Sequence, residues 1–332
     1  MGLKYKVSDD YDVYTNYTLS TDRTDNQRNI YTIGQRKSVS DQLKVYTEHQ
    51  YTHEDIQAGL GHTFGLDYQL TKQLNASLSY QSAQLERNDG DEVDRDAFSV
   101  GLSYKKDRTE ASTRLEYRKD KSNTTQTEQW VTTNRVNHRL SPSLRMQGRL
   151  NYSETNDQQG NTLDAKFAEA AIGFAYRPVD HDRHNILGRI TYLFDLQPLS
   201  QGANPDERSI IASLENSYQV NQRWEIGGKI AHRQGEIRDN RDAGNWEKND
   251  ATLVSVRARY HMNKNWDAIA QYHWLNSDES QDSQHGAMLS VDRHIGKNMK
   301  IGIGYNFTDF TDDLSNTDGT AKGWFVNLVG KF

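Results

Sequence analysis

Apolar and polar residues alternate along almost the whole chain with a period of two. In residues 58–70, Leu60, Phe64 and Leu66 fall on one face, and the other face carries glycine and polar residues. A period of two is typical of β-strands whose two faces meet different surroundings. Short polar breaks separate the runs, so the pattern predicts an all-β chain built from consecutive β-hairpins. The same alternation returns at 74–81, 98–105, 111–118, 144–152 and 299–307.

The breaks between the runs alternate in length. Tight breaks such as Ser40-Asp41-Gln42 and Ser141-Pro142-Ser143 take turns with longer polar ones such as 198–206 and 239–248. The four prolines lie in or beside breaks, where no ladder hydrogen bond is lost. We expect about 18 full strands, within a range of about 16 to 20, plus a half-strand at 2–7. No helical period or linker interrupts the series, so residues 1–332 are expected to form a single domain.

Alternation alone does not say which face of a strand is inside. A soluble β-sandwich buries its apolar face, whereas a membrane barrel turns that face to lipid and the polar face to a lumen. Three features favour the barrel: the unbroken meander, the short and long connections, and tyrosines near both strand ends, such as Tyr68 and Tyr80. The sequence therefore predicts a closed antiparallel up-and-down transmembrane β-barrel, with a soluble sandwich or fibre subunit as the alternative.

Charged residues fall on the polar face of the predicted strands. An arginine on the lipid face at mid-bilayer would cost about 2–4 kcal/mol, so these charges also fix the register. In the structural interpretation, these residues form ion pairs that fill and stiffen the interior. In the functional interpretation, they form a ring of charges that controls ion passage. The predicted pore-lining charges are Arg114, Glu116, Arg118, Arg145, Arg149, Arg189, Glu215, Lys229, Arg233, Arg257, Arg259 and Lys300.

Composition fits a barrel better than a soluble core. Only 34% of the residues are hydrophobic and the mean hydropathy is −0.95, which a barrel tolerates because only alternate residues need be apolar. The net charge is −6 without a basic tract, so we expect no nucleic-acid partner. Cysteine is absent, which excludes thiolate metal sites and cysteine nucleophiles. No apolar stretch is long enough for a transmembrane helix.

The chain ends in GWFVNLVGKF, with Trp324, Val326, Leu328 and the terminal Phe332 on one strand face. This ending resembles the C-terminal signal that the barrel-assembly machinery of Gram-negative bacteria reads, although Gly330 departs from it. Residues 173–198, 304–313 and 323–332 are similar to C-terminal barrel domains of large multi-domain bacterial outer-membrane or surface proteins. That resemblance implies a location in the cell outer membrane and no defined substrate. It also implies outer-membrane lipid, lipopolysaccharide and the assembly machinery as partners.

The first residues match the middle of later strands. Gly2-Leu3 resembles Gly65-Leu66 and Gly101-Leu102, which lie mid-strand. We therefore expect the chain to be trimmed at its N-terminus from a longer protein.

Chemical motifs are scarce. No nucleophile elbow or other hydrolase motif occurs, so we expect no enzyme. The run His181-Asp182-Arg183-His184 is better explained as a solvated turn than as a metal site, and we expect neither metal nor cofactor. No connection is long enough to be an obvious plug.

These observations favour a porin-like passive channel for small ions or solutes, slightly anion-favouring because basic residues outnumber acidic ones on the polar face. The alternative is a membrane anchor or export barrel for an upstream surface region, without solute transport. An outer-membrane lipid hydrolase is a third hypothesis, which lacks a supporting triad.

Overall fold

The structure is a computed structural model that describes residues 2–21, 27–55, 57–88, 90–181, 183–197, 205–241, 244–279, 282–296, 298–310, 314 and 322–330. These described residues form strands, turns and bends, without an α-helix. No helix that could cross a membrane was found among them.

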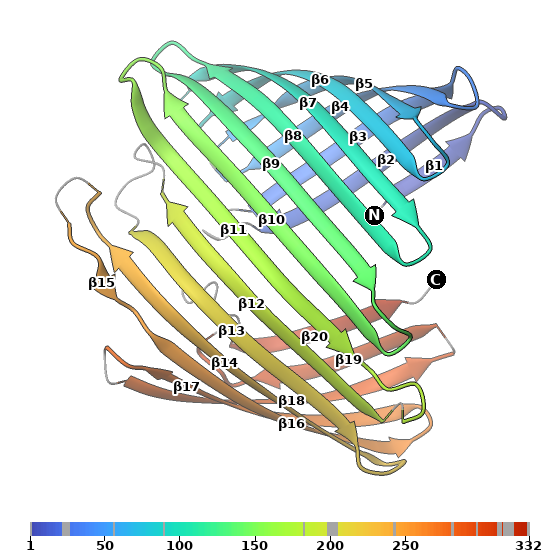
Figure 1. Ribbon diagram of the computed structural model, residues 1–332, viewed down its shortest axis with the longest axis vertical. Coiled ribbons are helices and arrows are strands. Elements are labelled where there is room, and N and C mark those ends of the chain that lie inside the picture. The colour runs from blue at the N-terminus through green and yellow to red at the C-terminus, as the bar shows by residue number, and fades with distance from the viewer. Residues whose placement is uncertain are drawn as a thin grey trace. The chain divides into compact units, whose positions relative to one another are not determined.

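The strands of the described residues form a 20-stranded sheet (Figure 1). In chain order they are β1 (Gly2–Lys6), β2 (Tyr11–Thr21), β3 (Gln27–Ser38), β4 (Leu43–Glu54), β5 (Gln57–Gln69), β6 (Leu74–Arg87), β7 (Glu92–Lys106), β8 (Thr109–Lys121), β9 (Gln126–Arg139), β10 (Leu144–Asp157), β11 (Thr162–Tyr176), β12 (His184–Leu196), β13 (Asp206–Gln219), β14 (Trp224–Arg238), β15 (Glu247–Lys248), β16 (Ala251–Asn263), β17 (Trp266–Ser277), β18 (Asp282–Ile295), β19 (Met299–Asn306) and β20 (Gly323–Gly330).

The chain divides into two compact units, and each is described by itself. Strands β1–β8 lie wholly in unit 1 and β13–β20 wholly in unit 2, whereas β9–β12 are shared between them. Unit 1 comprises Met1–Asn137, Arg149–Glu169 and Asp195–Gly202, and unit 2 comprises His138–Gly148, Ala170–Phe194 and Ala203–Phe332.

In unit 1, each strand from β1 to β8 pairs antiparallel with the next strand along the chain. The register between β7 and β8 sets Ser99 opposite Glu116 and Gly101 opposite Arg114. Paired residues of this kind point to the same side of the sheet, so small side chains on β7 lie beside long charged ones on β8.

Unit 2 continues the same order with one irregularity. Strand β14 pairs with both β13 and β16, and the two-residue β15 pairs with the last part of β14. From β16 to β20 each strand again pairs antiparallel with the next, with a register shift between His261 and Asn263 at the end of β16.

Several tight connections share one turn device, in which a polar side chain accepts two backbone N–H bonds. Ser40, Thr71, Ser141 and Asn221 each accept from the residues two and three positions later. Such side chains replace the backbone partners that a reversal leaves unpaired. This explains why these short breaks reverse the chain within three residues.

The two faces of the strands are inverted relative to a soluble sheet. On β5, Leu60 and Phe64 are 48% and 60% exposed, whereas Gly61 and Gly65 on the opposite face are buried. On β14, Ile230 is 53% exposed and its neighbour Ala231 is buried. Exposed apolar side chains in this regular alternation are typical of a barrel whose outer face meets lipid.

The predicted all-β, antiparallel up-and-down arrangement is confirmed. Without the five-residue β1 and the two-residue β15, the described residues supply 18 longer strands, as the sequence predicted. The half-strand at the start is also present, as β1. Strand β15 differs from the prediction, because it lies inside 239–248, which was assigned to a connection. Pairing of the first strand with the last, which closure requires, and a single domain both stay predictions.

Candidate functional site

All predicted pore-lining charges lie at strand positions that alternate with outward side chains. We call the side of each strand opposite the exposed apolar residues the polar face. For example, Arg189 is followed by Ile190, which is 56% exposed, and Arg257 follows Val256, which is 52% exposed. The register sets Glu215 opposite Lys229 on this face. The positions agree with a lumen, but lining a pore stays a prediction.

On β8 the predicted trio Arg114, Glu116 and Arg118 forms one network. Glu116 accepts a hydrogen bond from Arg114 and another from Arg118, each at 2.7 Å. The Glu116 side chain is 12% exposed and Arg114 is 58% exposed, so one sheltered carboxylate serves two guanidinium groups. Because a single negative charge faces two positive ones, the trio keeps one excess positive charge.

Two further arginines belong to the same face, although they are not among the predicted pore-lining charges. Arg95 on β7 makes a two-point contact with Asp120 through hydrogen bonds of 2.7 and 2.6 Å. Arg28 on β3 pairs with Glu54 at 2.9 Å. Both lie at polar-face positions, so the alternation would have found them had it been applied to these strand ends.

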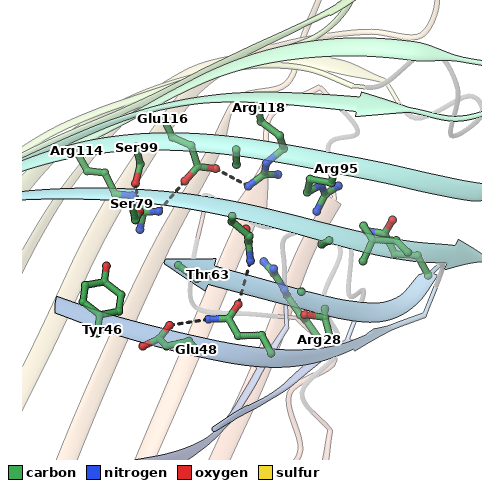
Figure 2. A pocket seen from close by; sticks show the side chains of 18 residues that line it. Arg28, Tyr46, Glu48, Thr63, Ser79, Arg95, Ser99, Arg114, Glu116 and Arg118 are labelled. Atoms are coloured by element: carbon green, nitrogen blue, oxygen red, sulfur yellow. Dashed lines mark hydrogen bonds and ion pairs between the residues drawn. The ribbon is translucent and has the colours of Figure 1, made fainter. Parts of the chain in front are cut away.

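These arginines border a cavity of about 310 Å³ on the polar face of β3–β8 (Figure 2). Its lining includes the small residues Gly61, Ala83, Ala97 and Ser99. Small residues leave open space between long side chains from neighbouring strands, which is why a cavity forms here. The same lining carries four arginines and two glutamates, namely Arg28, Arg95, Arg114, Arg118, Glu48 and Glu116.

Beside this cavity, tyrosine rings cover glycines on the polar face. The Tyr14 ring lies where a side chain on Gly34 would project, and the Tyr46 ring lies over Gly65 in the same way. The Arg36 guanidinium lies 5.8 Å from the Tyr14 ring centre and 5.3 Å from that of Tyr46. Glycine is therefore required at both positions by the close approach of a ring, and cation–π contact holds Arg36 between the two.

On the described strands β3–β8, positive charge exceeds negative charge on the polar face. The acidic side chains are fewer than the basic ones. The basic positions are Arg28, Arg36, Lys44, Arg87, Arg95, Lys105, Arg114 and Arg118, and the acidic ones are Glu48, Glu54, Asp67, Glu110, Glu116 and Asp120.

Unit 2 repeats the arrangement of one carboxylate between two arginines. Glu225 lies 3.5 Å from Arg257 and 3.2 Å from Arg259. Further along the polar face of the same unit, Lys300 of β19 pairs with Asp292 of β18 at 2.7 Å. The remaining predicted charges are divided between the units: Arg149 pairs with Glu169 in unit 1, and Arg145 and Arg189 lie in unit 2. The structure thus groups the predicted residues into separate networks.

Near the long connections of unit 2, apolar side chains occupy positions of the polar face. A buried cluster joins Ile211, Ala231, Ala251, Leu253 and Leu275 from four strands to Phe310 and Leu314 from the β19–β20 connection. Arg233 is 1% exposed beside this cluster, 3.0 Å from Glu207, and donates a hydrogen bond to the Leu314 carbonyl at 3.3 Å. No connection was expected to act as a plug, yet Phe310 and Leu314 cover part of this face.

A carboxylate between two histidines lies near the tight-turn end of unit 2. Asp267 is 2.6 Å from His261 Nδ1 and 2.9 Å from His294 Nε2. Among the residues that the structure describes, no group of three or more acidic or histidine side chains is arranged to hold a metal ion. We assign this contact a structural role across β16, β17 and β18.

The acidic β6–β7 connection makes hydrogen bonds and an ion pair with neighbouring side chains through Asp91. Thr124 donates to the Asp91 carboxylate at 3.1 Å, and Arg87 lies 3.4 Å from it. A hydrogen bond from Ser122 is the main reason that the pKa of Asp91 lies below its usual value. The charge of Asp91 is therefore balanced locally.

The predicted C-terminal assembly residues occupy the outward face of β20. Trp324, Val326 and Leu328 are 77%, 69% and 64% exposed. Trp324 pairs with Tyr305 of β19, and the two rings meet edge to face at 5.3 Å. Phe332 lies outside the described residues, and recognition by an assembly machinery stays a prediction.

Comparisons with known proteins identify the fold. No protein-family model matches the sequence, and a search of curated proteins gives no match. Among solved structures, the FrpB iron transporter from Neisseria meningitidis matches with a TM-score of 0.56 at 9% identity, over 98% of this chain and 71% of that chain. The copper transporter OprC matches with 0.52 at 9% identity, over 96% and 66%. The alcaligin outer membrane receptor FauA from Bordetella pertussis matches with 0.51 at 12% identity, over 99% and 72%.

This protein therefore has the fold of a large outer-membrane β-barrel. Its strands carry the exposed apolar face that such a barrel turns to lipid, and its predicted location in the outer membrane is confirmed. The chain spans about two thirds of the length of the OprC chain, 66%, and identities of 9–12% establish the fold alone. The neighbours are transporters and receptors by name.

Proposed function

We propose that this protein is a solute-conducting barrel of the outer membrane, a porin-like channel for small hydrophilic solutes with a weak preference for anions. The observation that carries the proposal is the polar face of β3–β8, where charged side chains border a cavity of about 310 Å³. Charged side chains are stable in water, and placing them in lipid has a high free-energy cost. A face lined by them is therefore suited to enclosed water.

Strand number supports a channel. Barrels of about 16–18 strands leave an aqueous path unless something fills it, whereas plugged transporters have about 22. The described residues supply 18 longer strands, so a barrel built from them is wide enough for an aqueous path.

Charge supports a weak anion preference. Glu116 and Glu225 each face two arginines, so both networks keep an excess positive charge. Most other polar-face arginines are paired with acids, such as Arg95 with Asp120, and neutral pairs select little. The preference is therefore expected to be small.

Planar-bilayer recording tests this function directly. In a gradient of potassium chloride, we expect single-channel steps and a reversal potential displaced toward that of chloride. An Arg118→Gln protein should conduct with a smaller displacement, while Arg293→Gln should behave as wild type. Arg293 is a matched control because it lies on the outward face against the Trp266 ring, at 5.4 Å from the ring centre. A folded barrel that shows no conductance would reject the channel and favour the anchor alternative.

A second candidate, uptake of a particular solute, is supported by the comparisons. The similar structures are an iron transporter, a copper transporter and an alcaligin receptor by name. Liposome swelling separates the two candidates. Through a passive channel, the rate falls smoothly as sugars grow larger and does not saturate with concentration. Specific uptake predicts saturation for one solute and little passage of sugars of equal size.

A further inference from the structure

We propose that the cavity on the polar face of β3–β8 is a binding site for small oxyanions, meaning solutes that carry a carboxylate or phosphate group. The inference deepens the channel function proposed above and rests on it for its role, because the bound oxyanion would be a solute in transit. Binding itself is measurable without conductance.

Three guanidinium groups reach the cavity from three strands: Arg28 from β3, Arg95 from β7 and Arg118 from β8 (Figure 2). Arg95 and Arg118 are diagonal neighbours, because the β7–β8 register sets Arg118 opposite Ala97 and Arg95 opposite Asp120. Like charges on adjacent strands repel. Asp120 already offsets the Arg95 charge, so an anion in the cavity gains most of its attraction from Arg118.

Arg118 has a donor left to offer. Its terminal nitrogen donates to Glu116 at 2.7 Å, but its Nε is buried and has no hydrogen-bond partner. A buried donor without an acceptor destabilises the state that contains it. The planar fork of a guanidinium matches two oxygens of a carboxylate or phosphate, so an oxyanion supplies the acceptor that Nε lacks.

The acidic groups around the cavity are already engaged. Asp120 is held at two points by Arg95, and Glu116 is shared by Arg114 and Arg118. Glu48, the other acid of the lining, accepts hydrogen bonds from Tyr14 at 2.6 Å and Gln50 at 3.2 Å. The arginine side of the cavity therefore keeps the excess positive charge of the Glu116 network.

The size and lining of the cavity fit a small polar solute. About 310 Å³ lies at the lower end of the range for small-molecule sites. Gln81 reaches across to Gln50 at 3.3 Å, which places amide groups beside the guanidinium groups. Such amides suit the hydroxyl groups of a hydroxy acid or sugar phosphate, whereas the lining offers little apolar surface for a hydrophobic ligand.

Calorimetric titration of the folded protein in detergent micelles tests the site. Inorganic phosphate and succinate are titrated in separate arms, each at low and at high potassium chloride. We expect saturable binding that weakens with salt, and the tighter arm identifies the preferred oxyanion. Arg118→Gln should weaken binding by about tenfold or more, and Arg118→Lys, which keeps the charge without the fork, should weaken it by less. Arg293→Gln on the outward face is the matched control and should bind as wild type.

The outcomes separate this inference from the channel itself. Binding retained in a barrel that does not conduct supports the site and overturns the channel. No binding of phosphate or succinate, or equal affinity in wild type and Arg118→Gln, overturns the site even where conductance is normal. Folding of each variant is checked by migration on an SDS gel with and without boiling. If Arg118→Gln does not fold, Arg28→Gln on β3 provides the same comparison.

Discussion

The polar faces of the two units share one arrangement of charges but differ in the groups that surround it. Each contains a glutamate between two arginines, Glu116 in unit 1 and Glu225 in unit 2. In unit 1 the arginines border a cavity of about 310 Å³. In unit 2 the long-connection end of the same face is closed over by Phe310 and Leu314 in an apolar cluster.

One alternating pattern therefore supports two kinds of polar face. Water can reach long charged side chains in unit 1, where Arg118 is 28% exposed. In unit 2, Arg233 is 1% exposed and depends on Glu207 and a backbone carbonyl. Charges on the first face are therefore expected to act mainly on passing solutes, and the buried arginine of the second mainly on stability.

The largest contrast is expected from placing a carboxylate on each face. Leu253 is fully buried in the unit 2 cluster, and Leu253→Asp should lower the free energy of unfolding by about 4 kcal/mol, since the new charge has no partner. Thr63 lines the unit 1 cavity, and Thr63→Asp should lower the free energy of unfolding by only about 1 kcal/mol. The cavity admits water and is bordered by arginines, although Glu48 lies opposite and repels the new charge. Urea unfolding in micelles, followed by tryptophan fluorescence, measures both. Equal losses would remove the distinction between the faces.

Removing an arginine from each face gives the next contrast. Arg233→Ala should cost about 3 kcal/mol of unfolding free energy, because Glu207 loses its buried partner and the Leu314 carbonyl its donor. Arg118→Ala should cost less than about 1 kcal/mol, because Glu116 keeps Arg114 and the site is partly exposed. The same urea titration compares them. A larger loss for Arg118→Ala would show that the unit 1 network is structural.

A third change tests the cover on unit 2 itself. Phe310 is 6% exposed in the cluster and meets the His273 ring edge to face at 6.4 Å. Phe310→Ala should lower the free energy of unfolding by about 2 kcal/mol, below the usual cost in a full core because a connection adjusts more easily than a strand. Single-channel conductance should also rise in the channel proposed above.

Phe307 is the matched control for this change. It is 50% exposed on the outward side, so Phe307→Ala should leave conductance unchanged and cost less than about 1 kcal/mol. Conductance that stays the same in Phe310→Ala would show that the cover does not narrow the path.

The period-two pattern predicted the strand order and the outward faces because it depends only on the side-chain direction of each residue. Leu60 and Phe64 are exposed for that reason. The same rule assigns Arg28 and Arg95 to the polar face, but it cannot show that their guanidinium groups converge. Convergence depends on the register of each strand with its neighbour and on the small side chains between them.

The apolar cluster of unit 2 was missed for a different reason. Leu253 and Leu275 lie opposite each other on neighbouring strands. They lie on the same strand faces as Arg257 and Gln271, so the alternation of the sequence assigns both leucines to the polar face. The sequence did contain a sign of this cluster, namely two leucines at polar-face positions near a long connection. Their contact with Phe310 depends on the path of a connection that carries no period.

The smallest effect is expected from the exposed member of the unit 1 trio. Arg114 is 58% exposed and shares Glu116 with Arg118, so Arg114→Gln should change the free energy of unfolding by less than about 0.5 kcal/mol. It should still move the reversal potential in a potassium chloride gradient by a few millivolts toward that of potassium, because a positive charge leaves the polar face. Arg293→Gln, with its charge on the outward face, should not move it. If both variants shift the reversal potential equally, the net charge of the protein alone would account for its selectivity. The position of a charge on the unit 1 polar face would then have no special effect.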